Sequence, residues 1–320
     1  MENSIQGRRR PRLPARHIAG RSALLAGLVL GLAASAGRGA AQEARPEDKR
    51  SIAELVEALA GELPFQRKQA AEALAAKGKA ALPAVRRALK DRDWKVRRGA
   101  TDALAALGAD GLAAAPQLAA ALKDKDAWVR AGAAAALGKM ETLPADAVQA
   151  LAAACTDPDK WVRESAVRSL GSATKDKKIL LTTAVAVVRL PDSGWGVRRH
   201  AMGILNRHGK DYKPAVPALI EMLTSPSEGM WDCSGSAVQL LAGMGEGKRA
   251  VPILIKRLDS KNRGVPRNAA GLLGKIGADA AAALPALRKV AATHEDKSYR
   301  SAAAQAVETI EAARKKEGGK

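Results

Sequence analysis

The sequence predicts an all-α fold, specifically an α-solenoid of about eight two-helix repeats. Similar segments recur every 30 to 36 residues between about residues 51 and 313, and each contains two amphipathic helical patterns. Hydrophobic residues make up 47% of the chain but aromatic residues only 2%, so Ala, Leu and Val must form the core, which favours closely packed helices. A unit of this length cannot bury its apolar stripe alone, so the units are expected to stack.

The first 41 residues are interpreted as a signal peptide rather than as part of the fold. A basic segment, RRRPRLPAR, precedes the apolar run SALLAGLVLGLAASA and the small-residue segment GRGAAQE. The apolar run is shorter than the roughly 20 residues that a membrane span needs. Cleavage after Ala41 is favoured, cleavage after Ala36 is the alternative, and an uncleaved membrane anchor stays open. We therefore expect a periplasmic or secreted protein, with a linker at 42–50 and no stable membrane span after cleavage.

The first helix of a unit often opens with proline. The segments are ALPAVRRALKD, AAPQLAAALKD, AVPALIEMLTS, AVPILIKRLDS and ALPALRKVAAT. Proline suits a first helical turn because its missing N–H would be unpaired there.

The second helix of a unit is best described relative to one anchor residue, which is Arg97 in the segment DRDWKVRRGATDALAALG. Apolar residues recur at −1, +3, +7 and +10 from the anchor, which places them in one narrow sector of a helix. The anchors of the eight units are Arg67, Arg97, Arg130, Arg163, Arg198, Ser234, Pro266 and Arg300. In the sixth unit Ser234 replaces the arginine, so a local irregularity is expected there.

The ends of the second helices also carry recognisable residues. Asp93, Asp126 and Asp159 stand just before the helix, where aspartate caps free N–H groups. Glycine often follows the helix, as helix C-termini prefer; these residues are Gly78, Gly108, Gly209, Gly245 and Gly277. After the last unit, residues 314–320 are expected to form a basic flexible tail.

The recurring signature D-x-D-x-x-V-R-x-x-A-x-x-A-L-G resembles the HEAT-repeat family, especially the short subclass of the phycobilisome lyases. The resemblance covers nearly all of the chain after residue 50. It implies that the second helices line a concave surface and that Asp and Arg form a ladder between adjacent repeats. A catalytic carboxylate pair should occur once, whereas this pattern occurs four times. The ladder residues are Asp91, Arg97, Asp124, Arg130, Asp157, Arg163, Asp192 and Arg198.

Positions −3, −2, +1, +2, +5 and +9 of each second helix point away from the apolar stripe, and we call them the outward positions. They hold twelve basic and four acidic residues, against 46 and 32 in residues 42–320. They also hold all five tryptophans. The residues predicted to bind a partner are Trp94, Lys95, Arg98, Trp128, Lys160, Trp161, Arg168, Trp195, Arg199, Arg207, Trp231, Arg263 and Arg267. Two interpretations of the tryptophans stay open: the rings cover the neighbouring turn and shield the ladder, or they form a stacking surface beside basic residues.

Catalytic and metal-binding patterns are not found in the sequence. His200 and His208 are too far apart for an i, i+4 metal pair, and the single pair His294–Glu295 is insufficient for the iron site of HEAT-type hydroxylases. No phosphate-binding glycine loop, CxxC or nucleophile elbow is present. No enzyme activity, metal or cofactor is therefore expected. The two cysteines, 155 and 233, lie two repeats apart and are expected to be free.

The formal net charge of +20 favours an anionic partner. The leading hypothesis is a monomeric, non-enzymatic, exported scaffold whose concave face binds an acidic protein or another anionic polymer. A nucleic-acid-binding protein or a HEAT-like DNA glycosylase is the first alternative, and the export signal argues against it. An accessory lyase or chaperone of the phycobilin-lyase type is the second alternative, which depends on analogy of fold alone.

Overall fold

Sixteen α-helices, short 3-10 turns and no strand are found in residues 48–191, 193–224, 231–262 and 264–318, which are the residues that this computed structural model describes. The helices alternate as first and second helices of eight units, so the predicted all-α solenoid of two-helix repeats is confirmed. The first helices are α1 (Ile52–Ala58), α3 (Leu82–Ala88), α5 (Ala115–Ala121), α7 (Ala145–Ala154), α9 (Lys177–Arg189), α11 (Val216–Thr224), α13 (Val251–Arg257) and α15 (Leu284–Thr293). The second helices are α2 (Pro64–Ala76), α4 (Trp94–Leu107), α6 (Ala127–Leu137), α8 (Lys160–Ala173), α10 (Trp195–His208), α12 (Trp231–Gly243), α14 (Gly264–Ile276) and α16 (Lys297–Gly318).

Several sequence predictions concern residues outside this description. The predicted signal peptide and the linker up to residue 47 lie outside it. So do Asp192 of the predicted ladder, Arg263 of the predicted binding residues, and the side chain of Trp231.

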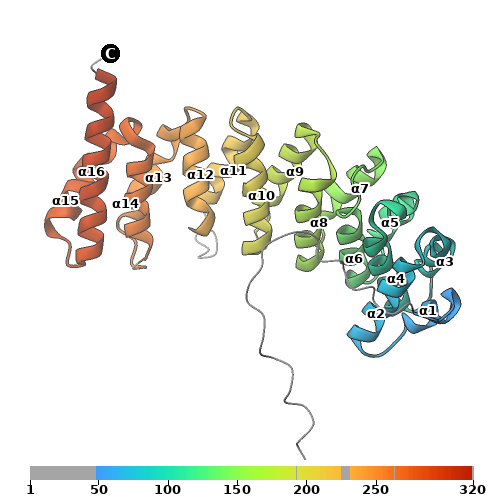
Figure 1. Cartoon of the computed structure of the whole chain (residues 1–320). Helices are drawn as coiled ribbons and strands as arrows, with labels where there is room; N and C mark the ends of the chain where they lie inside the picture. The colour runs from blue at the N-terminus through green and yellow to red at the C-terminus, as the bar shows by residue number, and fades with distance from the viewer. Residues whose placement is uncertain (1–47, 192, 225–230, 263, 319–320) are drawn as a thin grey trace, which may run out of the picture. The chain divides into compact units, whose positions relative to one another are not determined.

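The helices of residues 48–318 form two layers (Figure 1). Each second helix packs against the second helix of the next unit, in an unbroken series from α2 to α16. First helices contact one another in the same way, for example α5 with α7, α7 with α9 and α9 with α11. The sixth unit keeps this order, because α12 packs between α10 and α14 although serine replaces the anchor arginine.

The buried faces follow the predicted spacing. In the second unit Val96, Ala100 and Leu104 are buried, and Leu107 is partly buried against the core. Small residues let neighbouring second helices approach closely. A Cβ added at Gly138, which ends α6, would lie 2.5 Å from the Cβ and 3.0 Å from the Cα of Ser169 in α8. An Ala, Leu and Val core with such glycines therefore gives close helix packing without aromatic side chains.

The helix starts confirm the predicted capping residues. The side chains of Asp93, Asp126 and Asp159 accept hydrogen bonds from backbone N–H groups in the first turns of α4, α6 and α8. Prolines occupy the first turns of α3, α5, α13 and α15, where no N–H is needed.

The predicted glycines after the second helices divide into two kinds. Gly78, Gly108, Gly245 and Gly277 have positive φ, the conformation that favours glycine at a helix end. Gly209 has a φ of −104°, so its backbone does not require glycine. A Cβ there would lie 2.7 Å from the carbonyl oxygen of Leu205, and this crowding explains the glycine.

The predicted start of the first unit and the predicted C-terminal tail can both be compared with the helix ends in the structure. Ser51 caps α1 in a capping box with Glu54, so the first unit begins where it was expected. At the other end α16 continues to Gly318. Residues 314–318 are therefore the end of a helix and not a flexible tail.

Two segments of the described residues, Trp94–Ala121 and Gly264–Thr293, are long and apolar enough by composition to cross a membrane. Each of them comprises a second helix, a 3-10 turn and the next first helix, since the turns are Gly108–Ala114 and Gly277–Ala283. Their apolar residues supply the core between consecutive units.

Candidate partner-binding surface

The anchor arginine joins two consecutive units. Arg97 donates from Nε and Nη2 to the carboxylate of Asp124 at 2.7 and 2.9 Å. Its Nη1 donates to the carbonyl oxygens of Asp91 and Arg92 in the turn of its own unit. One guanidinium therefore closes its own interhelical turn and binds the aspartate of the next unit.

The same arrangement recurs one unit later. Arg130 donates from Nε and Nη2 to Asp157 at 2.8 and 2.9 Å, and from Nη1 to the carbonyl oxygen of Asp124. Asp157 Oδ1 also accepts from the backbone N–H of Asp159 at 2.8 Å. The carboxylate thus holds both the preceding unit and its own turn.

The next two anchors make the contacts within their own units. Arg163 donates to the carbonyl oxygens of Asp157 and Pro158, each at 2.8 Å. Arg198 donates to the carbonyl oxygens of Leu190 and Pro191. Arg97, Arg163 and Arg198 are buried and Arg130 is partly buried, so the guanidinium groups of these four anchors are part of the structure of the stack.

The ion pair changes the titration of its members. Burial raises the pKa of Asp124, but the hydrogen bonds from Arg97 and from the Asp126 backbone outweigh burial, and the pKa lies below its ordinary value. The hydrogen bond to Asp124 raises the pKa of Arg97 in turn. Both groups therefore stay charged at neutral pH, which suits a structural ion pair rather than proton transfer.

The tryptophan side chains are only partly covered. Trp128, Trp161 and Trp195 are 56%, 52% and 49% exposed. Trp94 is partly buried and packs against the core. About half of each of the three exposed residues is therefore open to solvent.

Basic side chains lie over two of these rings. Lys160 Nζ is 5.0 Å from the centroid of the Trp161 ring, and the Arg199 guanidinium carbon is 4.7 Å from that of Trp195. Distances of this size are typical of cation–π contacts. Arg199 lies four residues after Trp195 on α10, and residues at this spacing are neighbours on the surface of a helix, so the helical geometry places the guanidinium over the ring.

Two of the predicted binding residues, Lys95 and Arg98, are bonded within the fold. Lys95 Nζ lies 2.7 Å from Glu62 Oε1 of the preceding unit. Arg98 pairs with Asp102 at 3.0 Å and donates to the carbonyl oxygen of Trp128 at 2.8 Å. The Arg98–Asp102 pair follows from i, i+4 spacing, whereas Glu62 and the Trp128 carbonyl belong to other units and could not be identified from helical spacing.

A charged cluster joins α8 and α10. Burial lowers the pKa of His200, and the charges of Arg199 and Arg168 lower it further, while Glu164 acts in the opposite direction. A Cβ at Gly196 would lie 3.3 Å from Glu164 Oε1, so this carboxylate rests against the start of α10. The structure therefore places His200 among the predicted binding residues Arg168 and Arg199.

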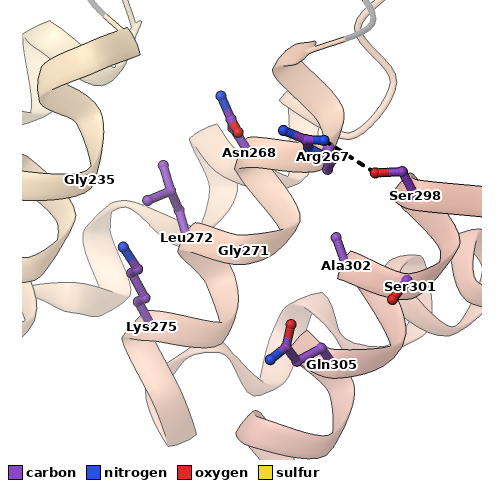
Figure 2. Close-up of a pocket in the computed structure, with 10 residues that line it drawn as sticks. All are labelled: Gly235, Arg267, Asn268, Gly271, Leu272, Lys275, Ser298, Ser301, Ala302 and Gln305. Carbon is purple, nitrogen blue, oxygen red and sulfur yellow. Dashed lines mark hydrogen bonds between the residues drawn. The ribbon is translucent and has the colours of Figure 1, made fainter.

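A groove of about 490 Å³ crosses α12, α14 and α16, and we call it the α14 groove. Figure 2 shows its lining, with Arg267 directed at Ser298 of α16 and Lys275 extending from α14 on the side of Gly235. Arg267 Nη1 donates to Ser298 Oγ at 3.2 Å. The groove is lined by Gly235, Arg267, Asn268, Gly271, Leu272, Lys275, Ser298, Ser301, Ala302 and Gln305.

The lining of the α14 groove coincides with the outward positions of three units. Arg267, Asn268, Gly271 and Lys275 are the +1, +2, +5 and +9 positions of the seventh unit. The groove contains two basic residues and no acidic residue. Asn268, Ser298 and Gln305 were not predicted as binding residues, although the same spacing points to them.

Charge is distributed unevenly along the outward positions. Glu72, Asp102 and Glu164 belong to the first four units, where Lys68 lies 3.8 Å from Glu72 and Arg98 pairs with Asp102. The described outward positions of the fifth, seventh and eighth units contain no acid. Arg199, Arg207, Arg267 and Lys275 in these units are exposed.

The described residues contain two buried thiols and no cluster of metal ligands. No group of three or more His, Cys, Asp or Glu within them could hold a metal ion. Cys155 and Cys233 are both buried and are not joined in a disulfide, as predicted, and burial raises the pKa of Cys155 to about 12. A thiol with such a pKa is a poor nucleophile at neutral pH.

Comparison with protein families gave one match. A model of HEAT repeats matches residues 52–138, 110–171 and 231–308, which together include more than half of the chain. A search of curated protein sequences gave no match.

Solved structures with a similar fold include two informative examples. Importin β is similar over 81% of this chain and 43% of its own length, with 16% identity and a TM-score of 0.60. YibA of E. coli is similar over 82% of this chain and 93% of its own, with 18% identity and a TM-score of 0.53. The CpcE–CpcF complex of phycocyanin lyase from Nostoc matches 72% of this chain and 91% of its own at 22% identity, but its TM-score of 0.37 supports no argument. Identities of this size show the fold alone.

Proposed function

Because this chain belongs to the HEAT-repeat family, we propose that it is a non-enzymatic, exported scaffold that binds an acidic protein segment on the outward face of its second helices. The observation that carries the proposal is the α14 groove, which is lined by Arg267 and Lys275 and by no acid. A cleft lined by charge of one sign attracts and steers a partner of the opposite sign.

The tryptophans add an apolar contribution beside these charges. Trp128, Trp161 and Trp195 are about half exposed, and Arg199 stacks on one of them. Large rings next to arginine are the commonest hot-spot residues of protein interfaces. The partner would therefore combine acidic side chains with apolar ones that cover the rings.

Export is the second element of the proposal. The N-terminal sequence combines a basic segment, an apolar run and small residues, which together favour a cleaved signal. Two measurements test export. The first is the mass of the N-terminal peptide of the protein purified from its native cell, and the second is the cellular compartment in which the protein is found. A chain that starts at Gln42 outside the cytoplasm supports export, and an intact chain in the cytoplasm rejects it.

The binding function is tested with a fluorescent oligoglutamate peptide, measured by anisotropy at several salt concentrations. The triple variant Arg199→Glu, Arg207→Glu and Arg267→Glu should weaken binding by more than about tenfold and flatten its salt dependence. The matched control reverses three exposed cations on the first helices, Arg87→Glu, Lys178→Glu and Lys256→Glu.

Two outcomes would reject this function. Equal loss of binding in the two triple variants would mean that net charge alone attracts the peptide. Tighter binding of a single-stranded oligonucleotide than of oligoglutamate, with the same dependence on Arg199, Arg207 and Arg267, would favour the nucleic-acid alternative instead.

A further inference from the structure

Two second helices share a pattern of cation, glycine and cation along their outward faces. On α10 it is Arg199, Gly203 and Arg207, and on α14 it is Arg267, Gly271 and Lys275. All six residues are exposed. Residues four and eight apart lie on one side of a helix, so each helix presents two cations about 12 Å apart along its axis with no side chain between them.

The helix between them carries the opposite pattern. On α12 the same three positions are Gly235, Gln239 and Gly243. This helix packs against both α10 and α14. A Cβ at Gly235 would lie 3.9 Å from Lys275 Nζ, so the ammonium of α14 extends over the start of α12.

The +1, +5 and +9 positions of these three consecutive helices define a basic strip that overlaps the α14 groove, and we call this strip the trough. Its glycine floor is Gly203 and Gly271, the +5 residues of α10 and α14, and the exposed Gln239 is the +5 residue of α12 between them. Arg199 and Arg267 are the +1 residues of α10 and α14, and Arg207 and Lys275 are their +9 residues, with the Lys275 ammonium extending towards Gly235 of α12. No aromatic or acidic residue occupies these nine positions.

Packing does not explain the glycines of the floor. A Cβ added at Gly203 or Gly271 would meet no neighbouring atom within 4 Å. At Gly99, by contrast, a Cβ would lie 2.8 Å from a methyl carbon of Leu59, and at Gly138 it would meet the backbone of Ser169. Glycine is unfavourable inside a helix, and the absence of a Cβ at these exposed positions leaves room for another chain close to the backbone.

We propose that this trough binds an extended acidic peptide that lies across α10, α12 and α14, with its backbone over the glycine floor and its carboxylates on the four flanking cations. The proposal rests on the function proposed above and specifies the conformation and position of the partner. Neighbouring helices are about 8–10 Å apart, so the two cation pairs are about 16–20 Å apart, a span of about six extended residues.

A peptide fits this trough better than a single-stranded nucleic acid does. Nucleic-acid grooves combine basic residues with aromatic rings on which successive bases stack. No ring occupies the nine positions of the trough, and Trp195 lies under Arg199 at its α10 end rather than along its floor. The two +1 arginines can each bind a carboxylate through two parallel hydrogen bonds.

The test fills the floor without changing any charge. The double variant Gly203→Gln and Gly271→Gln places two side chains in the trough, and glutamine is a better helix former than glycine, so the fold should be equally or more stable. Binding of an oligoglutamate peptide of about ten residues, long enough to cross all three helices, should weaken by at least about tenfold. The matched control is Ala186→Gln, an exposed position within α9 on the first-helix layer, which should bind as the wild type does.

The other outcomes separate the trough from the function on which it rests. If the glutamine variant binds as the wild type does while reversal of Arg199, Arg207 and Arg267 abolishes binding, the trough is wrong and the proposed function stands. Failure of the wild type to bind oligoglutamate overturns both. Oligothymidylate that binds more tightly than oligoglutamate and is expelled by the glutamine variant overturns the peptide as the occupant.

Discussion

Arg97 and Asp124 join two consecutive repeats through a two-point ion pair, with Nε–Oδ2 and Nη2–Oδ1 distances of 2.7 and 2.9 Å. Their side chains are 6% and 12% exposed. The pair brings the second helix of one unit to the turn of the next, and Arg130 and Asp157 repeat it. The charges that make the sequence look catalytic therefore hold the register of the stack, and the outward positions of the same helices are left for the proposed partner.

Removal of one member of the ladder should destabilise the protein strongly. Arg130→Met leaves the carboxylate of Asp157, which is 9% exposed, without its guanidinium. An unpaired buried charge of this kind costs about 3 kcal/mol or more. The measurement is the free energy of unfolding in urea, followed by circular dichroism.

The control is Lys68→Met, which removes a solvent-exposed pair with Glu72 in which the lysine side chain is 77% exposed. It should change the free energy of unfolding by less than about 0.5 kcal/mol. Equal costs for the two variants would show that the Arg130–Asp157 pair contributes nothing special to the stack.

The stability should fall at acid pH partly through Asp124. The pKa of this carboxyl is lower in the folded protein than in the unfolded chain, where it is about 3.9. Its contribution is therefore fully present above about pH 4 and is lost as the pH falls through the lower folded value. Thermal unfolding from pH 7 to pH 2 should show a smaller acid-induced fall in Tm for Asp124→Asn than for the wild type, and identical falls would contradict this linkage.

Alanine should have opposite effects at two glycines. At Gly138 the new Cβ would lie 2.5 Å from the Cβ of Ser169, and overpacking of this kind costs about 1–3 kcal/mol. At Gly203 the Cβ would meet nothing, and the better helix propensity of alanine should stabilise by about 1 kcal/mol. Urea unfolding of the two variants measures both changes, and a stabilising Gly138→Ala would refute the close approach of α6 and α8.

The cluster on α8 and α10 should be visible in the titration of His200. Burial lowers the pKa of this imidazole, and the charges of Arg199 and Arg168 add to that effect. Arg168→Gln removes one of the positive charges and should raise the pKa of His200 in an NMR titration. A pKa of His200 that is unchanged in the variant would place Arg168 away from it.

The repeat, the caps and the outward positions could be predicted because each depends on local spacing. The apolar stripe of Val96, Ala100 and Leu104 is visible in the sequence, and so is its opposite face, where the α14 groove lies. The link from Arg97 to Asp124 was expected from the family resemblance, and the structure brings those two residues together.

Features that depend on contacts between units could not be predicted in the same way. Lys95 pairs with Glu62 of the preceding unit, and Arg98 donates to the carbonyl oxygen of Trp128 in the next unit. Helical periodicity places a side chain on a face but says nothing of the residue opposite. The glycine floor at Gly203 and Gly271 could have been found by comparing the +1, +5 and +9 positions of the units, but only the structure shows that packing does not require these glycines.

The central claim is that an acidic partner binds the outward face of the second helices, and the tryptophan indole resonances of ¹⁵N-labelled protein test it most directly. Titration with oligoglutamate should shift the indole N–H signal of Trp195, whose ring lies under Arg199, while Trp94, which is partly buried, should shift least. The shifts should saturate and should disappear in the Arg199→Glu, Arg207→Glu and Arg267→Glu variant. Saturable binding that leaves every indole signal in place and perturbs only the first helices would contradict the account.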